Sequence, residues 1–462
     1  MQIIAAAQFD NYWKSQFGKS GSTNAIVDSA VREIIEAVRA EGDAAVRRYA
    51  ERFDKSSPAE PEVPFALAEE SWKEFCKNDP KTSAAMELAA DHIRNFAELQ
   101  RKHLFDFETE IKEGLFTGQR VIPVERAAVY VPAGRFPLFS SVLMGTIPAI
   151  AAGVSEILLV SPPMEDGIPS RNILAAAGLA GKSIGITCGT KLRIFAMGGA
   201  QAIAALALGT ESVPRSDIIV GPGNKYVAAA KKILYGEVGI DLIAGPTDVL
   251  VIADNAASRF EQSGNYGKTE PAELIAADML AQAEHDTDAK ARALVPDYST
   301  AEKIIAALEK RLAALPPESQ VTAKTSLDTG GIIIVYQTTE DAVRIANIIA
   351  PEHLELHCED PDAWISAGKS GGKNYLRNYG SLFIGSLAGE VLGDYSSGIN
   401  HTLPTSGGAR FTGGLSVRNF LKIPTTLRCI RSKGFEEARK AAEILGAAEG
   451  LYGHAQAALE RQ

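Results

Sequence analysis

Four short segments of the chain contain most of the side chains that can bind a metal ion or transfer a proton. They hold four of the seven histidines in 462 residues, and each of these histidines has a carboxylate or carboxamide close by. Metal centres and proton-transfer sites both need such combinations, so the pattern points to an enzyme. The segments are QAEH (282–285), APEHLEL (350–356), GDYSSGINH (393–401) and EGLYGHA (449–455).

The first segment closes an amphipathic helix that we expect to begin near Pro271. Met279 and Gln282 continue the apolar stripe of this helix, and His285 follows three residues later, so an amide and an imidazole face inward. Two inward polar groups need partners. Hydrogen bonds within the core are the favoured explanation from this segment alone, because glutamine is an uncommon zinc ligand.

The second segment places Glu352 and His353 side by side at the start of an apparent strand. Pro351 disfavours helix at Ala350, so the preceding helical stretch should stop there. Neighbouring strand residues point to opposite faces unless a turn splays them. The two groups could act as an acid–base pair, and a solvated strand edge explains them equally well in isolation.

The third and fourth segments differ in how strongly they indicate a site. Asp394 and His401 flank a stretch of glycines and serines that lets the backbone approach a ligand, which favours a functional loop. Glu449 and His454 lie on a polar, alanine-rich helical tail, and that segment alone favours an exposed helix.

Two glycine-rich turns each follow a strand-like run and open a helix, which presents backbone N–H groups to a phosphate. Neither contains GxGxxG, so the usual dinucleotide fingerprint is absent, and tight turns without a ligand remain an alternative. The turns are MGGAQAIAAL (197–206) and VGPGNKYVAAAKK (220–232).

Composition excludes several classes of partner. The formal net charge of −10 and the absence of a long basic run argue against nucleic acid or an anionic membrane, and favour a small molecule. The four cysteines are isolated, which suggests neither a disulfide framework nor a zinc knuckle, and indicates a reducing compartment. We find no signal peptide and no long apolar run, and expect a cytoplasmic protein.

The order of elements predicts an α/β fold. Helical periodicity dominates residues 29–53 and 82–104, and after residue 127 short apolar runs alternate with alanine-rich helical segments. That alternation is typical of parallel sheets with crossover helices. The polar stretch 258–269 is expected to be an inserted surface loop. The expected strands are AAVYVP, EILLVS, IGITC, DIIVGP, DVLVIA and GIIIVY.

Taken together, these segments resemble the histidinol dehydrogenase family from about residue 28 to the end. Eight motifs occur in the family's order: VYVPAGRFPLFSSVLM, GGAQAIAAL, GPGNKYV, AGPTDVLVIAD, DMLAQAEH, APEHLEL, GDYSSGINHTLPT and EGLYGHA. The resemblance implies two Rossmann-like domains and an enzyme that uses zinc, one ion per subunit, and two NAD⁺ to oxidise histidinol through histidinal to histidine.

The resemblance also implies domains and a homodimer with shared active sites. The implied domains are an N-terminal extension (1–27), a discontinuous catalytic α/β domain (28–129 and 249–420), a Rossmann-like NAD-binding domain (130–248) and a helical dimerisation tail (421–462).

Residue roles follow from the matched motifs. His353 is the implied base for the hydroxyl proton, and Glu352 the implied activator of water. The implied zinc ligands are Gln282, His285 and Asp394 with His454 of the other subunit. The implied substrate-binding residues are Thr247, Gln282, His285, His353, Asp394, His401, Glu449 and His454. The implied NAD-binding residues are Tyr130, Gln201 and Asn224.

Departures from the family pattern keep other functions open. Thr247-Asp248 stands where the family often has Ser-Glu, which preserves a hydroxyl and a carboxylate. The segments ARFTGGLSVRNFLK and TTLRC, with the stretch 258–269, are similar to paralogues such as sulfopropanediol dehydrogenase, which oxidise another small polar alcohol. A zinc hydrolase is a further alternative, but it would not need the NAD-binding residues, and a non-catalytic module would not need Glu352 and His353.

Overall fold

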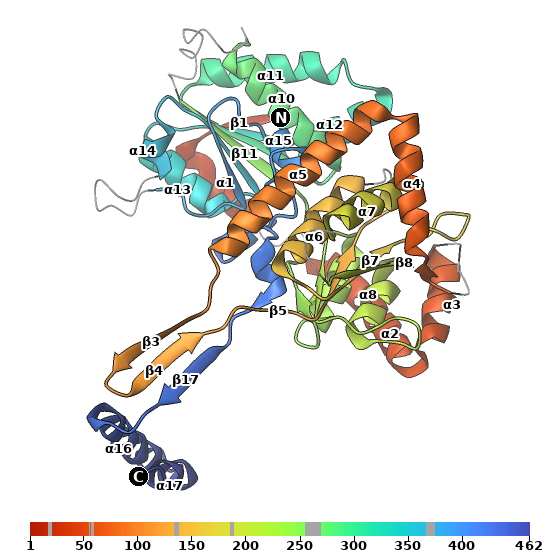
Figure 1. Ribbon diagram of the computed structural model, residues 1–462. Helices are drawn as coiled ribbons and strands as arrows, with labels where there is room; N and C mark the ends of the chain where they lie inside the picture. Colours follow the sequence, from red (N-terminus) through yellow and green to blue (C-terminus); the bar gives the residue numbers. More distant parts are fainter. Residues whose placement is uncertain are drawn as a thin grey trace.

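The computed structural model has an α/β architecture with two six-stranded, mostly parallel sheets in neighbouring bodies and a long arm that ends in two helices (Figure 1). This confirms the predicted fold class. None of the described helices is long and apolar enough to cross a membrane. The structure describes residues 1–16, 21–54, 56, 60–133, 138–184, 189–254, 269–365 and 375–462.

The first sheet is parallel throughout and carries apolar side chains on both faces, as a sheet covered by helices on each side requires. Its strands, in spatial order, are β1 (Gln2–Ala5), β13 (Ile332–Val335), β12 (Lys290–Val295), β11 (Asp248–Ala253), β14 (His353–His357) and β15 (Ser381–Ile384).

Helices cover both faces of this sheet. Residues of α10 (Pro271–His285), α11 (Tyr298–Leu312) and α12 (Pro317–Gly330) share one apolar core with the strands. Residues of α1 (Phe9–Gln16), α13 (Thr339–Ile349) and α14 (Pro361–Ile365) share the core of the opposite face. Helix α13 stops where the sequence predicted, because Ala350 adopts a left-handed conformation before Pro351.

The second sheet is parallel except at one edge, where β2 runs antiparallel. In spatial order it contains β10 (Gly239–Ile240), β9 (Ile218–Val220), β6 (Arg126–Tyr130), β7 (Glu156–Ser161), β8 (Lys191–Ala196) and β2 (Glu62–Val63). Of the strand expected at IGITC (184–188), Ile184 is the last residue of α7 and residues 185–188 lie outside the described part; the strand β8 follows at KLRIFA (191–196).

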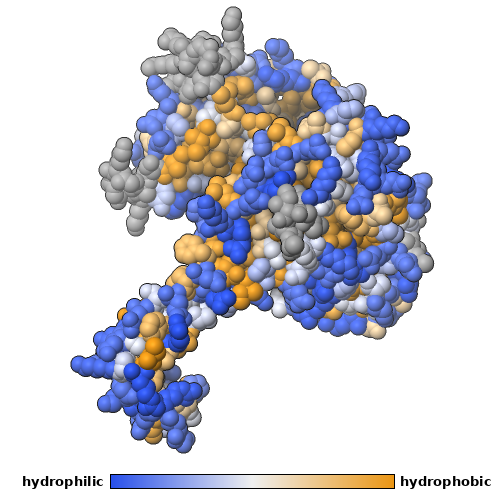
Figure 2. Space-filling view, viewed as in Figure 1, coloured by the Kyte–Doolittle hydropathy of each residue, from blue (hydrophilic) through white to orange (hydrophobic). Residues whose placement is uncertain are grey.

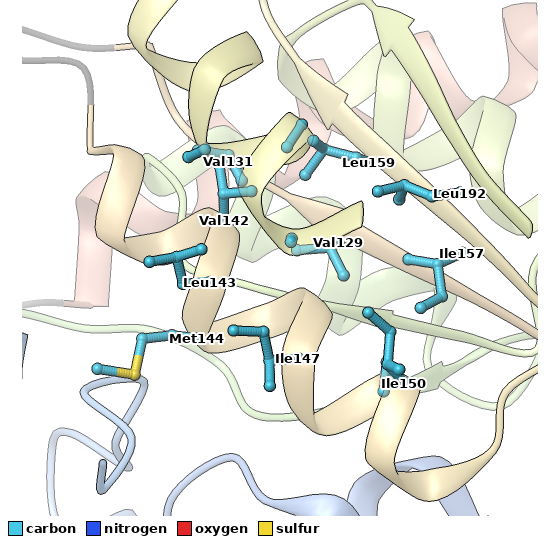
Figure 3. Close-up of a cluster of buried hydrophobic side chains, with 14 of the residues drawn as sticks. Val129, Val131, Val142, Leu143, Met144, Ile147, Ile150, Ile157, Leu159 and Leu192 are labelled. Carbon is cyan, nitrogen blue, oxygen red and sulfur yellow. The ribbon is translucent and has the colours of Figure 1, made fainter. Parts of the chain in front are cut away.

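Two layers of helices also enclose the second sheet. On one face α6 (Phe139–Ala152) packs Val142 and Ile147 against Val129 and Leu159 of the strands (Figure 3). That layer also includes α7 (Arg171–Ile184), α4 (Phe65–Asn78) and α5 (Pro80–Lys102). The other layer consists of α2 (Gly21–Glu41), α3 (Asp43–Phe53), α8 (Gly199–Leu208) and α9 (Lys225–Leu234).

The arm joins segments that are far apart in the sequence. A three-stranded antiparallel sheet leads away from the body to the two terminal helices, and the arm stands clear of the rest of the molecule (Figures 1 and 2). The arm contains β3 (Phe107–Lys112), β4 (Leu115–Gln119), β17 (Thr425–Cys429), α16 (Lys433–Ala448) and α17 (Tyr452–Leu459), and a short pair, β5 (Ile122–Pro123) with β16 (Leu421–Lys422), lies at its base.

The sheets divide the N-terminal region differently from the boundaries that the resemblance implied. Residues 2–5, expected in an extension, form the edge strand of the first sheet. Helices α2 and α3, expected in the catalytic domain, pack their apolar faces on α8 and α9 beside the second sheet. The difference arises from tertiary packing. The sequence of an amphipathic helix shows that one face is buried, but it does not show which sheet that face packs against. The expected loop 258–269 lies outside the described residues except for its last position.

Candidate active site

The candidate site lies at the beginning of the neighbouring strands β11 and β14 of the first sheet, on the side of the second body. Strand β14 carries His353, Glu355 and His357 at alternate positions, so their side chains share one face. Helix α10 turns Asp278, Gln282 and His285 toward that face. The short helix α15 (Glu390–Tyr395) adds Glu390 and Asp394. These side chains form one continuous row, which we call the polar seam.

Glu352 lies just before β14, and its carboxylate is directed at Thr247, whose hydroxyl also accepts the hydrogen bond of Gln282. Its Oε2 accepts hydrogen bonds from the Thr247 hydroxyl at 2.5 Å and from the Asp248 N–H at 3.1 Å. The Asp248 carboxylate in turn accepts the Glu352 N–H and pairs with Arg292 at 2.6 Å. Burial raises the pKa of Glu352 to about 7, although His353 and the Thr247 hydroxyl oppose the rise. A carboxyl with that pKa can serve as a base near neutral pH.

His353 is buried among acids. Its Nε2 lies 3.5 Å from Asp394 Oδ1, and its Nδ1 lies 3.4 Å from the Asp248 carbonyl oxygen and 3.8 Å from Glu390 Oε2. Burial lowers the pKa of His353, but the carboxylates of Glu352, Asp394 and Glu390 outweigh it and raise the pKa to about 10. Nothing among the described residues hydrogen-bonds to Nε2, so this nitrogen is available to a ligand.

Two of the three zinc ligands implied for one chain lie together, and the third contacts Thr247. His285 Nε2 is 3.9 Å from Asp394 Oδ2, and the Gln282 amide donates to the Thr247 hydroxyl at 2.9 Å. Gln282 is fully buried, as predicted, but His285 is half exposed, so the prediction that its imidazole also faces the core is wrong: the ring lies at the last residue of α10, where the helix leaves the sheet. Burial raises the pKa of Asp394, but His353, His401 and His285 together hold it below its usual value. The carboxylate is therefore charged and ready to bind a cation.

His401 connects the two bodies at the site. Its Nδ1 lies 3.0 Å from the Asp394 carbonyl oxygen, and its Nε2 lies 3.2 Å from the hydroxyl of Ser141 on α6. Asn400 also donates to the Met144 carbonyl at 2.7 Å. Burial lowers the pKa of His401, more than the neighbouring Asp394 raises it, so the ring is neutral. The sequence analysis did not select Ser141, although it lies inside one of the quoted motifs.

The residues expected to bind NAD share the carboxyl edge of the second sheet. The Tyr130 hydroxyl at the end of β6 accepts the Gly199 N–H at 3.1 Å. Gln201 in the first turn of α8 donates to Asp54 at 3.2 Å. Asn224 caps α9 by accepting the N–H groups of the next helical residues. Dinucleotides bind at this edge of open α/β sheets.

A backbone contact explains the glycine of the second turn. Gly221 has a φ of +109°, and a Cβ there would lie 2.1 Å from the Tyr130 carbonyl oxygen. The turn therefore needs glycine to pass β6. Asp54 was missed in the sequence because nothing local marks it, yet it holds Gln201, and burial raises the pKa of its carboxyl to about 6.

Glu449 and His454 are not brought to the site in the single chain. Both are exposed, and both lie at the far end of the arm, at the end of α16 and in α17 (Figure 1). The resemblance assigned His454 to the other subunit, and the position of the arm is compatible with that assignment.

A different group of acidic and imidazole side chains also lies close enough together to hold a metal ion. Among the described residues, the ligand atoms of Asp278, Glu355 and His357 all lie within 4.8 Å of one another. Glu355 and His357 are fully buried. The sequence analysis missed this group because its members come from separate elements and form no local motif.

The fold and the site define an α/β enzyme with a buried acid–base pair at one sheet and a dinucleotide-type edge at the other. The profile of the family described as Histidinol dehydrogenase matches residues 18–462. The chain belongs to the histidinol dehydrogenase family, and like its members it is an NAD-dependent oxidoreductase.

Relatives and a solved structure support this assignment. Histidinol dehydrogenase from Thermus thermophilus is 41% identical over 443 residues, which cover 96% of each chain. That from Aquifex aeolicus is 41% identical over 437 residues, covering 94% of this chain and 92% of its own. The crystal structure of histidinol dehydrogenase from Elizabethkingia anophelis is similar with a TM-score of 0.85 at 32% identity, covering 100% of this chain and 98% of that one.

Proposed function

We propose that the protein oxidises L-histidinol through L-histidinal to L-histidine, the last step of histidine biosynthesis, with NAD and one zinc ion per subunit at the residues described above. The observation that carries the proposal is the buried Glu352–His353 pair beside Gln282, His285 and Asp394 in a chain of this family. When bound, NAD would accept the electrons of both oxidations and zinc would polarise the substrate oxygen.

The two catalytic residues divide the proton chemistry. His353 Nε2 faces the Asp394 side of the site, where the hydroxyl of a bound alcohol would lie, and takes that proton. The surrounding carboxylates favour the protonated imidazole of His353. A cation that neutralises Asp394 would lower the pKa of His353 and so favour the neutral ring, which can accept a proton. Glu352, hydrogen-bonded to Thr247, removes a proton from the water that adds to the aldehyde.

The donors fit a zinc ion. The 3.9 Å between His285 Nε2 and Asp394 Oδ2 is too long for a hydrogen bond, and it places both groups near enough to converge on one ion. Gln282 adds an amide to this set, which contains no thiolate. Three donors from one chain leave a fourth position for a neutral nitrogen, and we propose His454 of a second copy for it.

The arm supports a homodimer with shared active sites. Its sheet and helices expose several large apolar side chains that nothing in the single chain covers. Exposed apolar residues on so small a structure favour burial against a partner, and a two-fold pair would exchange arms reciprocally. The tail of each copy would then bring Glu449 to the imidazole of the substrate and His454 to the zinc. The exposed side chains are Phe107, Ile111, Leu427, Ile444 and Tyr452.

The substrate is tested by the yield of NADH. Histidinol should give two NADH per molecule and histidine as product, because the same site carries both oxidations. A sulfonated diol and a simple diol serve as comparison substrates at equal concentration. Efficient turnover of the sulfonated diol, with no turnover of histidinol, would contradict the assignment. It would indicate a paralogous dehydrogenase that acts on another alcohol. Hydrolysis of an ester without NADH would favour a zinc hydrolase.

A further inference from the structure

A second cluster of ligand-type side chains lies deeper in the polar seam than the proposed zinc ligands. His357 is four residues beyond His353 on β14, a separation of about 13 Å along the strand. Asp278 lies one helical turn before Gln282 on α10, on the same side of the helix. The cluster of Asp278, Glu355 and His357 is therefore a separate place in the molecule, and neither catalytic residue belongs to it.

The imidazole of His357 makes no hydrogen bond among the described residues, although Asp278 and Glu355 are within hydrogen-bonding reach of each other. His357 Nε2 lies 3.4 Å from Glu355 Oε2 and 3.9 Å from Asp278 Oδ2. Both ring nitrogens of His357 and the Oε2 of Glu355 are buried without a hydrogen-bond partner among the described residues. The imidazole is 99% buried, so water does not reach it freely. Buried polar groups in folded proteins are nearly always paired, so these atoms are directed at a site that a ligand can occupy.

The spacing in this cluster leaves room for one ion. Two donors about 2.0–2.2 Å from an ion, at a tetrahedral angle, lie about 3.3–3.6 Å apart. The His357–Glu355 distance of 3.4 Å meets this spacing, and the Asp278 carboxylate, 3.9 Å from the ring, lies a few tenths of an ångström outside it.

The charge around the cluster also favours a cation. Asp278 and Glu355 lie next to Glu390, whose two carboxylate oxygens are buried and without a hydrogen-bond partner among the described residues. Several carboxyl groups in one dry region repel each other unless they hold protons or a cation. The Glu355 side chain is held in place whether it binds a proton or a cation, because its other oxygen accepts a hydrogen bond from the Glu390 N–H at 2.6 Å.

We infer that Asp278, Glu355 and His357 form a second binding site, for a divalent first-row transition-metal ion such as Zn²⁺. One imidazole nitrogen with two carboxylate oxygens suits such an ion, whereas Mg²⁺ and Ca²⁺ prefer sets of oxygen ligands alone. The ion joins α10 to β14 and so holds the surfaces that carry Gln282 and His353. The site is structural and does not depend on which alcohol the enzyme oxidises.

Metal content tests the inference without any measurement of activity. The full-length protein is stripped with a chelator, dialysed against ZnCl₂, freed of loosely bound ions on a desalting column and analysed by mass spectrometry. We expect about two zinc ions per subunit in the wild type and about one in His357→Leu. His285→Ala, which alters only the proposed catalytic set, should also retain about one, and the double variant none. Asp278→Asn is the matched variant for the case in which His357→Leu does not fold.

The outcomes separate the two sites. The second site would be overturned if the wild type held one zinc ion per subunit and this ion were retained in His357→Leu and Asp278→Asn but lost in His285→Ala. Shared protons, and not a metal ion, would then compensate the carboxylates of the seam. Loss of zinc in His357→Leu together with full retention in His285→Ala would instead support the second site and contradict the zinc ligands of the proposed function. Melting of the wild type should rise on zinc addition more than melting of His357→Leu, because an ion that binds only the folded state stabilises it.

Discussion

His353 and Asp394 face each other across the active site, with His353 Nε2 3.5 Å from Asp394 Oδ1. The same carboxylate lies 3.9 Å from His285. Asp394 therefore belongs both to the proposed metal set and to the surroundings of the proposed base. A cation on Asp394 reduces the negative charge that holds a proton on His353, which couples metal binding to the readiness of the base.

Replacing His353 by asparagine should slow the first oxidation by about 10²–10⁴-fold, because the general base is lost. Asparagine keeps a polar group at this buried position and leaves a smaller space than alanine would. Single-turnover formation of NADH from histidinol measures the step, while zinc content and NAD binding serve as controls. An unchanged rate with metal and NAD retained would show that another group takes the hydroxyl proton.

Replacing Glu352 by glutamine should impair the conversion of aldehyde to acid more than the oxidation of alcohol. The pKa of Glu352, raised to about 7 by burial, also sets a pH dependence. A base acts in its deprotonated form, so the aldehyde reaction of the wild type should rise as the pH increases through about 7 and then level off. Glutamine cannot titrate, and this limb should vanish. Equal losses in both half-reactions at every pH would contradict the division of roles.

Local patterns in the sequence predicted much of the site. The helix beginning at Pro271 and the inward direction of Gln282 are confirmed, because 3.6-residue periodicity fixes which side of a helix is buried. Strand alternation does not decide the direction of Glu352, because this residue lies just before β14 and its carboxylate is fixed instead by Thr247 and the Asp248 N–H.

What the sequence could not provide depends on contacts between distant elements. Glu390, Glu355 and Asp278 meet only when α15, β14 and α10 pack together, and no spacing along the chain announces this. The membership of residues 2–5 in the first sheet is equally non-local, because that short apolar run pairs with β13, more than 300 residues away. The arm, likewise, brings β3 and β4 beside β17 across a long separation.

Replacing Lys231 by methionine should destabilise the body that contains the second sheet. Lys231 forms a buried ion pair with Asp241 and donates to the Gly221 carbonyl at 3.0 Å, and Asp241 accepts the Gly221 N–H at 2.7 Å. Removing one partner leaves a buried charge unpaired, which costs about 3–5 kcal/mol. Urea unfolding should show an earlier midpoint, and the double variant with Asp241→Asn should recover part of the loss. A midpoint equal to the wild type would contradict the burial of this pair.

Mixing two inactive variants should restore activity if active sites are shared between copies. His285→Ala removes a ligand from the body of one copy, and His454→Ala removes a ligand from its arm. His454 is exposed on α17, a helix that stands far from α10 in the single chain (Figure 1). In a heterodimer with exchanged arms, both lesions fall in one site and the other site is complete. We expect about half of the wild-type activity per heterodimer, isolated with two different affinity tags after co-expression. Each homodimer of a single variant is the control for residual activity. Heterodimers that form but stay inactive would show that each tail serves its own subunit, and that the exposed apolar side chains of the arm meet some other surface.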